Sequence, residues 1–229
     1  MRKCSSSIAL ALLLGACGSG TPAPAPTEAR ERPDDPLPVM GPERHVVAFG
    51  DSLFAGYNVG EGESYPARLE VALRARGINA RVVNAGVSGD TSAAGLQRLA
   101  FTLDNQPGVP DLVILELGGN DLLRGLSPSE TRANLGAALA ELKKRNIQVL
   151  LMGMRAPPNM GAAFQKEFDA IYPALAKQHG VALVPFLLEA VYDKPDLIQD
   201  DRVHPTAGGI EEMVASTADD VVKALPEKS

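Results

Sequence analysis

Cysteine, histidine and tryptophan are scarce in this chain. Its 229 residues include two cysteines, three histidines and no tryptophan. Cys4 lies in a segment that we expect to be removed, so the mature chain would hold one cysteine and could form no internal disulfide. The cysteine and histidine spacing of a zinc site is also absent. The lack of tryptophan leaves no visible aromatic platform on which a sugar could stack.

Positive charge is in the minority. The chain has 22 Lys and Arg against 28 Asp and Glu, a formal net charge of −6. An acidic surface repels nucleic acid and anionic headgroups, so we expect no nucleic-acid partner and no electrostatic attachment to a membrane. We expect a small-molecule partner and a monomer, with any membrane contact made by a lipid anchor.

Residues 1–16 have the pattern of a secretory signal. Arg2 and Lys3 precede a short apolar run at 8–14, which is too short to span a bilayer, and small residues end the segment. Cys17 follows directly, an arrangement that resembles a bacterial lipobox and implies lipidation of Cys17. The alternative is an ordinary signal peptide with a cysteine nearby.

The rest of the chain divides by composition. Residues 17–43 are rich in proline and hold no aromatic residue, which predicts an extended tether behind the lipidated cysteine. Residues 44–225 have the size of one domain, and 226–229 form a tail. No aspartate directly follows Cys17, so we expect the anchor in the outer membrane of a bacterial cell envelope, facing the periplasm.

The domain alternates strand-like and helix-like segments. Five short runs, several of them continuously apolar, predict parallel strands: Val46–Phe49, Arg81–Asn84, Leu112–Leu117, Val149–Met152 and Ala182–Pro185. Helical patterns lie between them, including a stripe at 164–175 and a last helix at 210–221. Ser64 is a candidate cap for one helix, and Ser127-Pro128 begins another as a capping box. Five strands alternating with five helices predict a three-layer α/β/α sandwich around a five-stranded parallel sheet.

A serine follows the first predicted strand. The run Gly50-Asp51-Ser52-Leu53 places Ser52 at the carboxyl edge of the sheet, where ligands bind in such folds. The Ser52 N–H and the positive end of a following helix would favour negative charge there. Asp51 and Ser52 are also common helix caps, so this motif alone leaves both interpretations open.

A carboxylate and an imidazole precede the last predicted helix. Asp201 and His204 are three residues apart, which lets the carboxylate accept the imidazole Nδ1–H and leaves Nε2 free to face a serine. His45 and His179 lie at element ends and are interpreted as structural. The spacing therefore indicates a base and the group that orients it.

Two further loops offer hydrogen-bond donors. Gly89 follows the second strand, where a backbone N–H without a side chain can approach a reacting carbonyl closely. Asn120 follows the third strand, and its side-chain amide can donate to an oxyanion. Ser88 stands in an incomplete Gly-x-Ser-x-Gly motif, in the wrong strand context for a nucleophile. Each motif also has an ordinary interpretation as a turn.

Ser52, Gly89, Asn120 and His204 together resemble the SGNH (GDSL) hydrolase superfamily. More narrowly, the chain is similar to the branch of thioesterase I, lysophospholipase L1 and the arylesterases. The supporting strings are VSGDTS at 87–92, ELGGND at 116–121, RAPPNMG at 155–161 and IQDD at 198–201. The resemblance implies a flavodoxin-like sheet, a Ser52–His204–Asp201 triad, and an oxyanion hole made by Ser52, Gly89 and Asn120.

The resemblance implies hydrolysis of carboxylic esters or thioesters through an acyl-enzyme, with no metal or organic cofactor. We assign substrate contacts to Asp51, Gly119, Pro158, Asn159 and Met160. Met160 stands where this branch often carries tyrosine, which leaves the acyl preference open. The alternatives are a carbohydrate acetylesterase, a non-catalytic lipid-anchored binding module, and a metallophosphoesterase, which would need more histidines than the chain has.

Overall fold

A computed structural model describes residues 39–227 of the chain. The predicted signal at 1–16, the lipidation site Cys17 and most of the predicted tether lie outside the described residues, as do the last two residues of the tail. Regular elements run from Arg44 to Ala224.

The centre of the domain is a five-stranded parallel sheet. Its strands are β1 (Arg44–Gly50), β2 (Ala80–Gly86), β3 (Leu112–Glu116), β4 (Gln148–Met152) and β5 (Ala182–Val184). They lie in the order β2-β1-β3-β4-β5, every pair parallel. This is the flavodoxin-like order, in which the strand order reverses between β1 and β3. All five predicted strands and the predicted fold class are confirmed.

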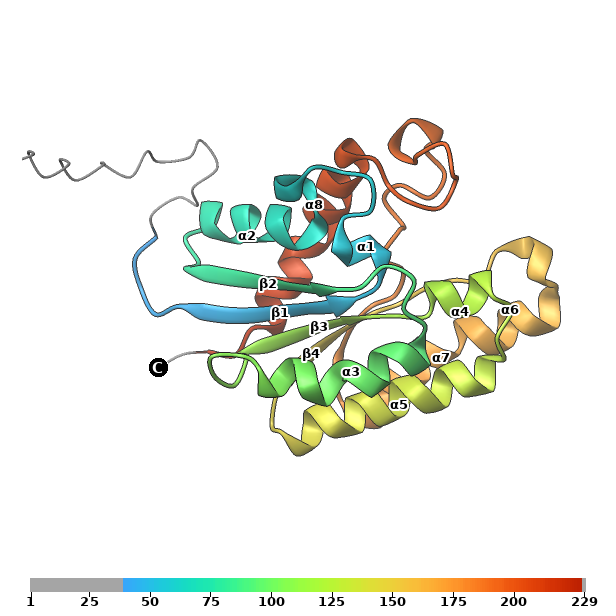
Figure 1. Cartoon of the computed structure of the whole chain (residues 1–229), viewed down its shortest axis with the longest axis horizontal. Coiled ribbons are helices and arrows are strands. Elements are labelled where there is room, and N and C mark those ends of the chain that lie inside the picture. Colours follow the sequence, from blue (N-terminus) through green and yellow to red (C-terminus); the bar gives the residue numbers. More distant parts are fainter. Residues whose placement is uncertain (1–38, 228–229) are drawn as a thin grey trace, which may run out of the picture. The chain divides into compact units, whose positions relative to one another are not determined.

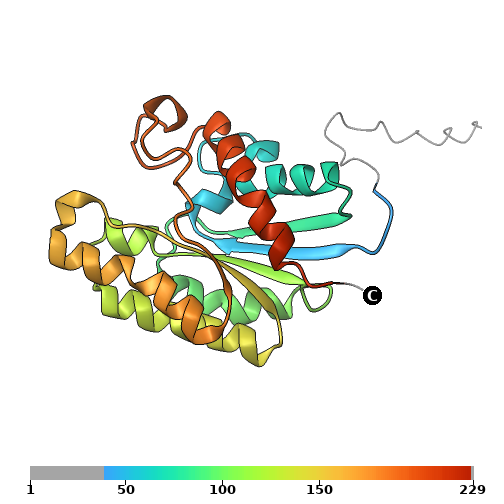
Figure 2. The same cartoon turned by 180° about the vertical axis from the view of Figure 1, so that it is seen from behind.

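Helices cover both faces of the sheet, as Figures 1 and 2 show. One face carries α1 (Ser52–Ala55), α2 (Tyr65–Ala75) and α8 (Ala207–Ala224). The other carries α3 (Ser92–Asp104), α5 (Pro128–Lys144) and α7 (Ile171–His179), with α4 (Gly119–Leu123) and α6 (Ala162–Asp169) at its end. Short 3-10 turns occur at Glu61–Glu63, Pro158–Met160 and Pro195–Leu197.

The core lies between the sheet and these two helical layers. Every residue of β3 is buried, and so is the run from Val46 to Gly50 in β1, which explains the apolar runs within these two strands. The largest buried side chains include Tyr65, which stacks on Phe54, and Tyr172. The two central strands are therefore fixed by packing on both faces, and their carboxyl ends are held firmly.

The helix prediction was incomplete. The described residues hold eight α-helices where the sequence predicted five, and the helical patterns identified in the sequence did not include α1, α3 or α4. The predicted stripe at 164–175 is divided at Ala170 into α6 and α7. The last helix begins at Ala207 with Thr206 as its cap, so it extends beyond both ends of the predicted range 210–221.

Helix ends follow local chemistry. Ser127 accepts the Glu130 N–H at 3.3 Å and Pro128 is the first helical residue, as predicted for the start of α5. Ser64 occupies the cap position of α2, as predicted, but its side chain makes no cap hydrogen bond. Gly180 ends α7 in a left-handed conformation.

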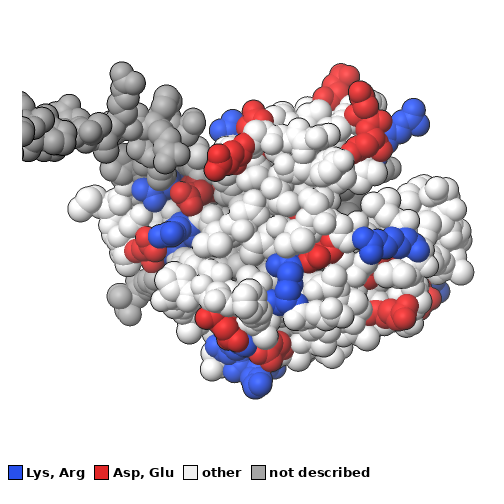
Figure 3. Space-filling model, viewed as in Figure 1, with Lys and Arg blue, Asp and Glu red and all other residues white. Residues whose placement is uncertain are grey.

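On the face drawn in Figure 3, basic and acidic side chains are interspersed over a largely uncharged surface. Among residues 39–227 no helix is long and apolar enough to cross a membrane.

Candidate active site

The nucleophile candidate lies where β1 ends. Ser52 is the first residue of α1, directly after the buried strand, as its position in the sequence predicts. Asp51 caps this short helix, because its Oδ1 accepts the Leu53 N–H at 3.0 Å. Asp51 is the helix cap and Ser52, next to it, is the candidate nucleophile. The motif can therefore serve as a cap and present a nucleophile at the same time.

His204 connects Ser52 to Asp201. The distance from His204 Nε2 to Ser52 Oγ is 2.8 Å, and that from His204 Nδ1 to Asp201 Oδ2 is 2.7 Å. Both lie in the range of strong hydrogen bonds. The chain folds so that residues 152 positions apart in sequence meet with the spacing of a nucleophile, a base and its orienter.

The Asp201 carboxylate is itself held by backbone donors. Its Oδ1 accepts the N–H groups of Val203 at 2.9 Å and His204 at 3.0 Å, within a tight turn in which Arg202 has φ +59°. Partial burial alone would raise the pKa of Asp201, but the hydrogen bonds from His204 and Val203 outweigh it and lower the pKa to about 2. Asp201 is therefore ionised at neutral pH, which fixes Nδ1 of the imidazole as the protonated nitrogen.

The two donor loops lie at the same edge of the sheet. Gly89 follows β2 with φ +86°, a conformation that favours glycine. Within residues 39–227, the N–H groups of Ser52 and Gly89 donate to no protein acceptor. Asn120 lies in the first turn of α4, and its Nδ2 donates to Asp51 Oδ2 and to the Asp90 carbonyl, both at 3.0 Å. The edge thus combines two free backbone donors and one engaged amide.

A cavity of about 360 Å³ opens beside Ser52. Four of the five residues assigned to substrate contact line it: Asp51, Gly119, Asn159 and Met160. The fifth, Pro158, lines a larger cavity of about 700 Å³ next to it. Both cavities are of a size that suits small molecules. Met154 is buried but lines both cavities.

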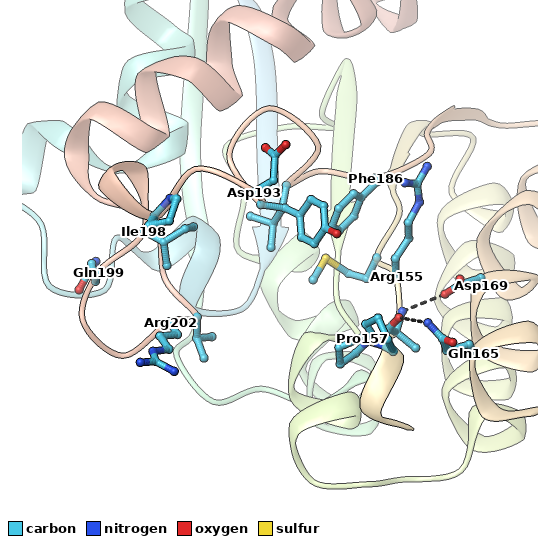
Figure 4. A pocket seen from close by; sticks show the side chains of 16 residues that line it. Arg155, Pro157, Gln165, Asp169, Phe186, Asp193, Ile198, Gln199 and Arg202 are labelled. Carbon is cyan, nitrogen blue, oxygen red and sulfur yellow. Dashed lines mark hydrogen bonds between the residues drawn. The ribbon is translucent and has the colours of Figure 1, made fainter. Parts of the chain in front are cut away.

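The larger cavity is drawn in Figure 4. The loop after β4 lines one side with Arg155 and Pro157, and the segment before His204 lines the other with Ile198 and Arg202. The two cavities share five lining residues, Met154, Pro157, Leu188, Arg202 and Val203. They are therefore adjoining parts of one hollow at the carboxyl edge of the sheet.

Comparison with known families agrees with this arrangement. A model of the GDSL-like Lipase/Acylhydrolase family matches residues 48–211. The chain belongs to this family. The matched span includes Ser52, Asn120, Asp201 and His204.

Individual GDSL-like proteins are similar over most of their length. Thioesterase 1/protease 1/lysophospholipase L1 of Escherichia coli (strain K12) is 44% identical over 160 residues, 70% of this chain and 74% of that protein. The arylesterase of Vibrio mimicus is 39% identical over 180 residues, 79% of this chain and 89% of that protein. The crystal structure of AlinE4, an SGNH-hydrolase family esterase, is 66% identical with a TM-score of 0.70 and covers 82% of this chain and 100% of that one.

Several residues of this GDSL-like site were missed by sequence reasoning. Arg98 Nε contacts Asp90 Oδ2 at 2.5 Å and its Nη2 donates to the Gly50 carbonyl at 2.9 Å, which joins the Gly89 loop to the end of β1. Asp121 accepts hydrogen bonds from Ser92 N–H, Ser92 Oγ and Thr131 Oγ1 at 2.7, 2.5 and 3.0 Å, which braces α4 behind Asn120. The only signal for Asp121 was its place in the GGND string.

Proposed function

We propose that the protein is a serine hydrolase that cleaves carboxylic esters or thioesters through an acyl-enzyme on Ser52. The observation that carries the proposal is the continuous chain of hydrogen bonds from Asp201 through His204 to Ser52, at 2.7 and 2.8 Å. Membership of the GDSL-like family and similarity to proteins named as esterases and thioesterases support the same reaction class.

The reaction has two halves. In the first, Ser52 Oγ forms a bond to the acyl carbon while its proton passes to His204 Nε2, and the leaving alcohol or thiol takes that proton as its bond to carbon breaks. In the second, His204 removes a proton from water as the water oxygen bonds to the acyl carbon. The bond between Ser52 Oγ and that carbon then breaks, Ser52 Oγ takes the proton back from His204, and the acid leaves. Asp201, ionised at neutral pH, stabilises the imidazolium that forms in both halves.

Negative charge develops on the acyl oxygen in each half. We assign its stabilisation to the Ser52 N–H, the Gly89 N–H and the Asn120 side-chain amide, since the two backbone donors have no protein acceptor among the described residues. A donor of this kind contributes about 3 kcal/mol to lowering the barrier. In the unliganded site the Asn120 amide is bonded to Asp51 and Asp90, so an oxyanion would have to share or replace one of those bonds.

The acyl group would occupy the cavity beside Ser52. Leu122, Leu123, Met154 and Met160 give it an apolar lining, which suits an acyl or aryl group better than a sugar. Because Met is flexible, Met160 would tolerate acyl groups of different shape.

A series of p-nitrophenyl esters of increasing acyl length tests this assignment. We expect hydrolysis to extend beyond acetate to longer acyl groups, and Ser52→Ala to abolish it for every ester. Activity confined to acetate, together with release of acetate from acetylated glycans, would favour a carbohydrate acetylesterase. Catalysis that survives Ser52→Ala undiminished would contradict the proposal itself.

We also propose a location. The sequence of residues 1–17 supports export, removal of the signal and lipidation of Cys17, followed by the tether at 17–43 and the domain at 44–225. Metabolic labelling with a tagged fatty acid tests this: we expect label on the wild-type protein in the outer-membrane fraction and none on Cys17→Ser. Unlabelled wild-type protein in the soluble periplasmic fraction would contradict the anchor.

A further inference from the structure

Two carboxyl groups lie buried against each other beneath the site. Asp51 is 2% exposed and Glu116, the last residue of β3, is fully buried at 0%. The Asp51 N–H donates to Glu116 Oε2 at 3.1 Å. The mechanism proposed above uses the triad and the oxyanion donors, and it does not involve Glu116.

The two carboxyl groups differ in the hydrogen bonds that they accept. Asp51 accepts one hydrogen bond at each oxygen, from Leu53 N–H and from Asn120 Nδ2, both at 3.0 Å. Glu116 Oε2 accepts the Asp51 N–H, whereas Glu116 Oε1 is buried without a hydrogen-bond partner. A charged oxygen in that position would be costly, because neither water nor a donor compensates it. The contacts therefore favour the charge on Asp51 and the proton on Glu116.

The titration behaviour of the pair agrees with this assignment. Burial, and then the negative charge of Asp51, raise the pKa of Glu116 well above its usual range. Burial also raises the pKa of Asp51, opposed by the hydrogen bond from the Leu53 N–H, by the side chains of Glu116 and Asn120, and by the nearby His204. Two adjacent carboxyls in an apolar site cannot both ionise readily, so they bind one proton between them.

The spacing of the pair depends on glycine at position 50. A Cβ built on Gly50 would lie 2.6 Å from Glu116 Oε2, so any larger residue would push the Glu116 carboxyl away from the Asp51 backbone. The run Gly50-Asp51-Ser52-Leu53 therefore does two things: Gly50 leaves room for the Glu116 carboxyl, and the run presents Ser52.

We propose that Asp51 and Glu116 share one proton and that the single remaining charge, on Asp51, is a positioning device for Asn120. A carboxamide can turn by 180° and exchange its nitrogen and oxygen ends at little steric cost. Asp51 Oδ2 and the Asp90 carbonyl are both acceptors, so together they hold the nitrogen end in place. An Asn120 turned the other way would present an acceptor to the oxyanion and repel it. This inference rests on the esterase function proposed above.

The substitution Asp51→Asn isolates the charge. Its Oδ1 can still accept the Leu53 N–H, so the helix cap is kept, but its amide nitrogen meets the Asn120 nitrogen donor to donor. We expect kcat for p-nitrophenyl butyrate to fall by about tenfold or more with KM changed by less than about twofold, because only an interaction of the transition state is lost.

A double substitution separates positioning from stability. Asn120→Ala alone is expected to lower kcat by about 10²-fold. If Asp51 acts through Asn120, adding Asp51→Asn to Asn120→Ala should lower kcat by no more than about a further twofold. Equal losses in both backgrounds, or an Asp51→Asn protein with wild-type kcat, would overturn the proposal.

Glu116 provides the matched variant and a readout without substrate. Glu116→Gln keeps an uncharged hydrogen-bonding side chain, so we expect a smaller loss of kcat than for Asp51→Asn.

The infrared spectrum at neutral pH should contain the C=O stretch of a protonated carboxyl in wild type and in Ser52→Ala, and lose it in Glu116→Gln. A spectrum without that band in wild type would refute the shared proton even if every esterase assay succeeded. Conversely, wild-type protein that carries the band but hydrolyses no ester would refute only the proposed function.

Discussion

The ring of Tyr57 lies against the imidazole of His204, with centroids 4.3 Å apart and ring planes tilted by 31°. Gln199 holds the two segments together, since its Nε2 donates to the Tyr57 carbonyl at 3.0 Å and to the Pro205 carbonyl at 2.8 Å. The Gln199 N–H also donates to the His204 carbonyl at 2.8 Å. The loop that carries His204 is thereby attached to the segment that follows Ser52.

This contact predicts a positioning role for the Tyr57 ring. Tyr57→Leu should lower kcat/KM by roughly fivefold, because an aromatic pair contributes about 1 kcal/mol beyond the area that it buries. Tyr57→Phe keeps the ring and should recover most of that loss. Steady-state kinetics of both variants test whether the ring is responsible. A Phe variant as impaired as the Leu variant would assign the effect to the hydroxyl instead.

Asp201→Asn should reduce kcat without unfolding the protein. Replacing a buried triad aspartate by asparagine costs about 10⁴-fold in kcat. The Asp201 side chain is 37% exposed, so solvent takes over part of its role and we expect a smaller loss, about 10²-fold. Steady-state kinetics at neutral pH measure it, and a kcat equal to wild type would remove Asp201 from the mechanism.

The same carboxylate gives a pH dependence of stability with a defined sign. Its pKa in the folded protein is about 2, below the ordinary value of 3.8, so its contribution to stability is fully present above 3.8 and is lost as the pH falls through about 2. Acid unfolding of Asp201→Asn should lack that contribution. If the difference in unfolding free energy between wild type and Asp201→Asn stayed constant as the pH fell from 3.8 to about 2, the lowered pKa would be contradicted.

Gly118 should resist substitution more than any surface glycine. Its φ is +118°, and a Cβ at this position would lie 2.2 Å from the hydroxyl oxygen of the buried Tyr172, which donates to the Leu117 carbonyl at 2.9 Å. We expect Gly118→Ala to lower the free energy of unfolding by more than about 2 kcal/mol, measured by denaturant titration. Gly108→Ala is the matched control, because nothing lies within 4 Å of its added Cβ. Equal stability of the two variants would contradict the packing described around Gly118.

The sequence was sufficient to predict the sheet and the meeting of Ser52, His204 and Asp201 at its edge. Ser52 and Asn120 each follow a strand that contains a buried apolar run, and parallel strands end at one edge of the sheet, so their meeting follows from local patterns. Asp201 and His204 are close in sequence, and their contact is set by a single turn. Burial and strand direction were enough to bring these residues together.

The rest depends on contacts that no local pattern encodes. Gln199 and the Tyr57 carbonyl are 142 positions apart, and Arg98 and the Gly50 carbonyl are 48 apart. Helix α3 was missed because its buried face is made partly of Ser92 and Gly95, while Phe101 is 72% exposed, which disguises the apolar stripe. The contact between Glu116 and Asp51, 65 positions apart, could likewise be identified only in the folded protein.

The most direct test of the central claim is covalent labelling of Ser52. We expect a fluorophosphonate to inactivate the wild-type protein stoichiometrically in the presence of EDTA, and peptide mass spectrometry to locate the adduct on Ser52. His204→Ala should label far more slowly, since the proton of Ser52 then has no acceptor. Complete labelling at another serine, or full esterase activity in a protein that remains unlabelled, would contradict the account.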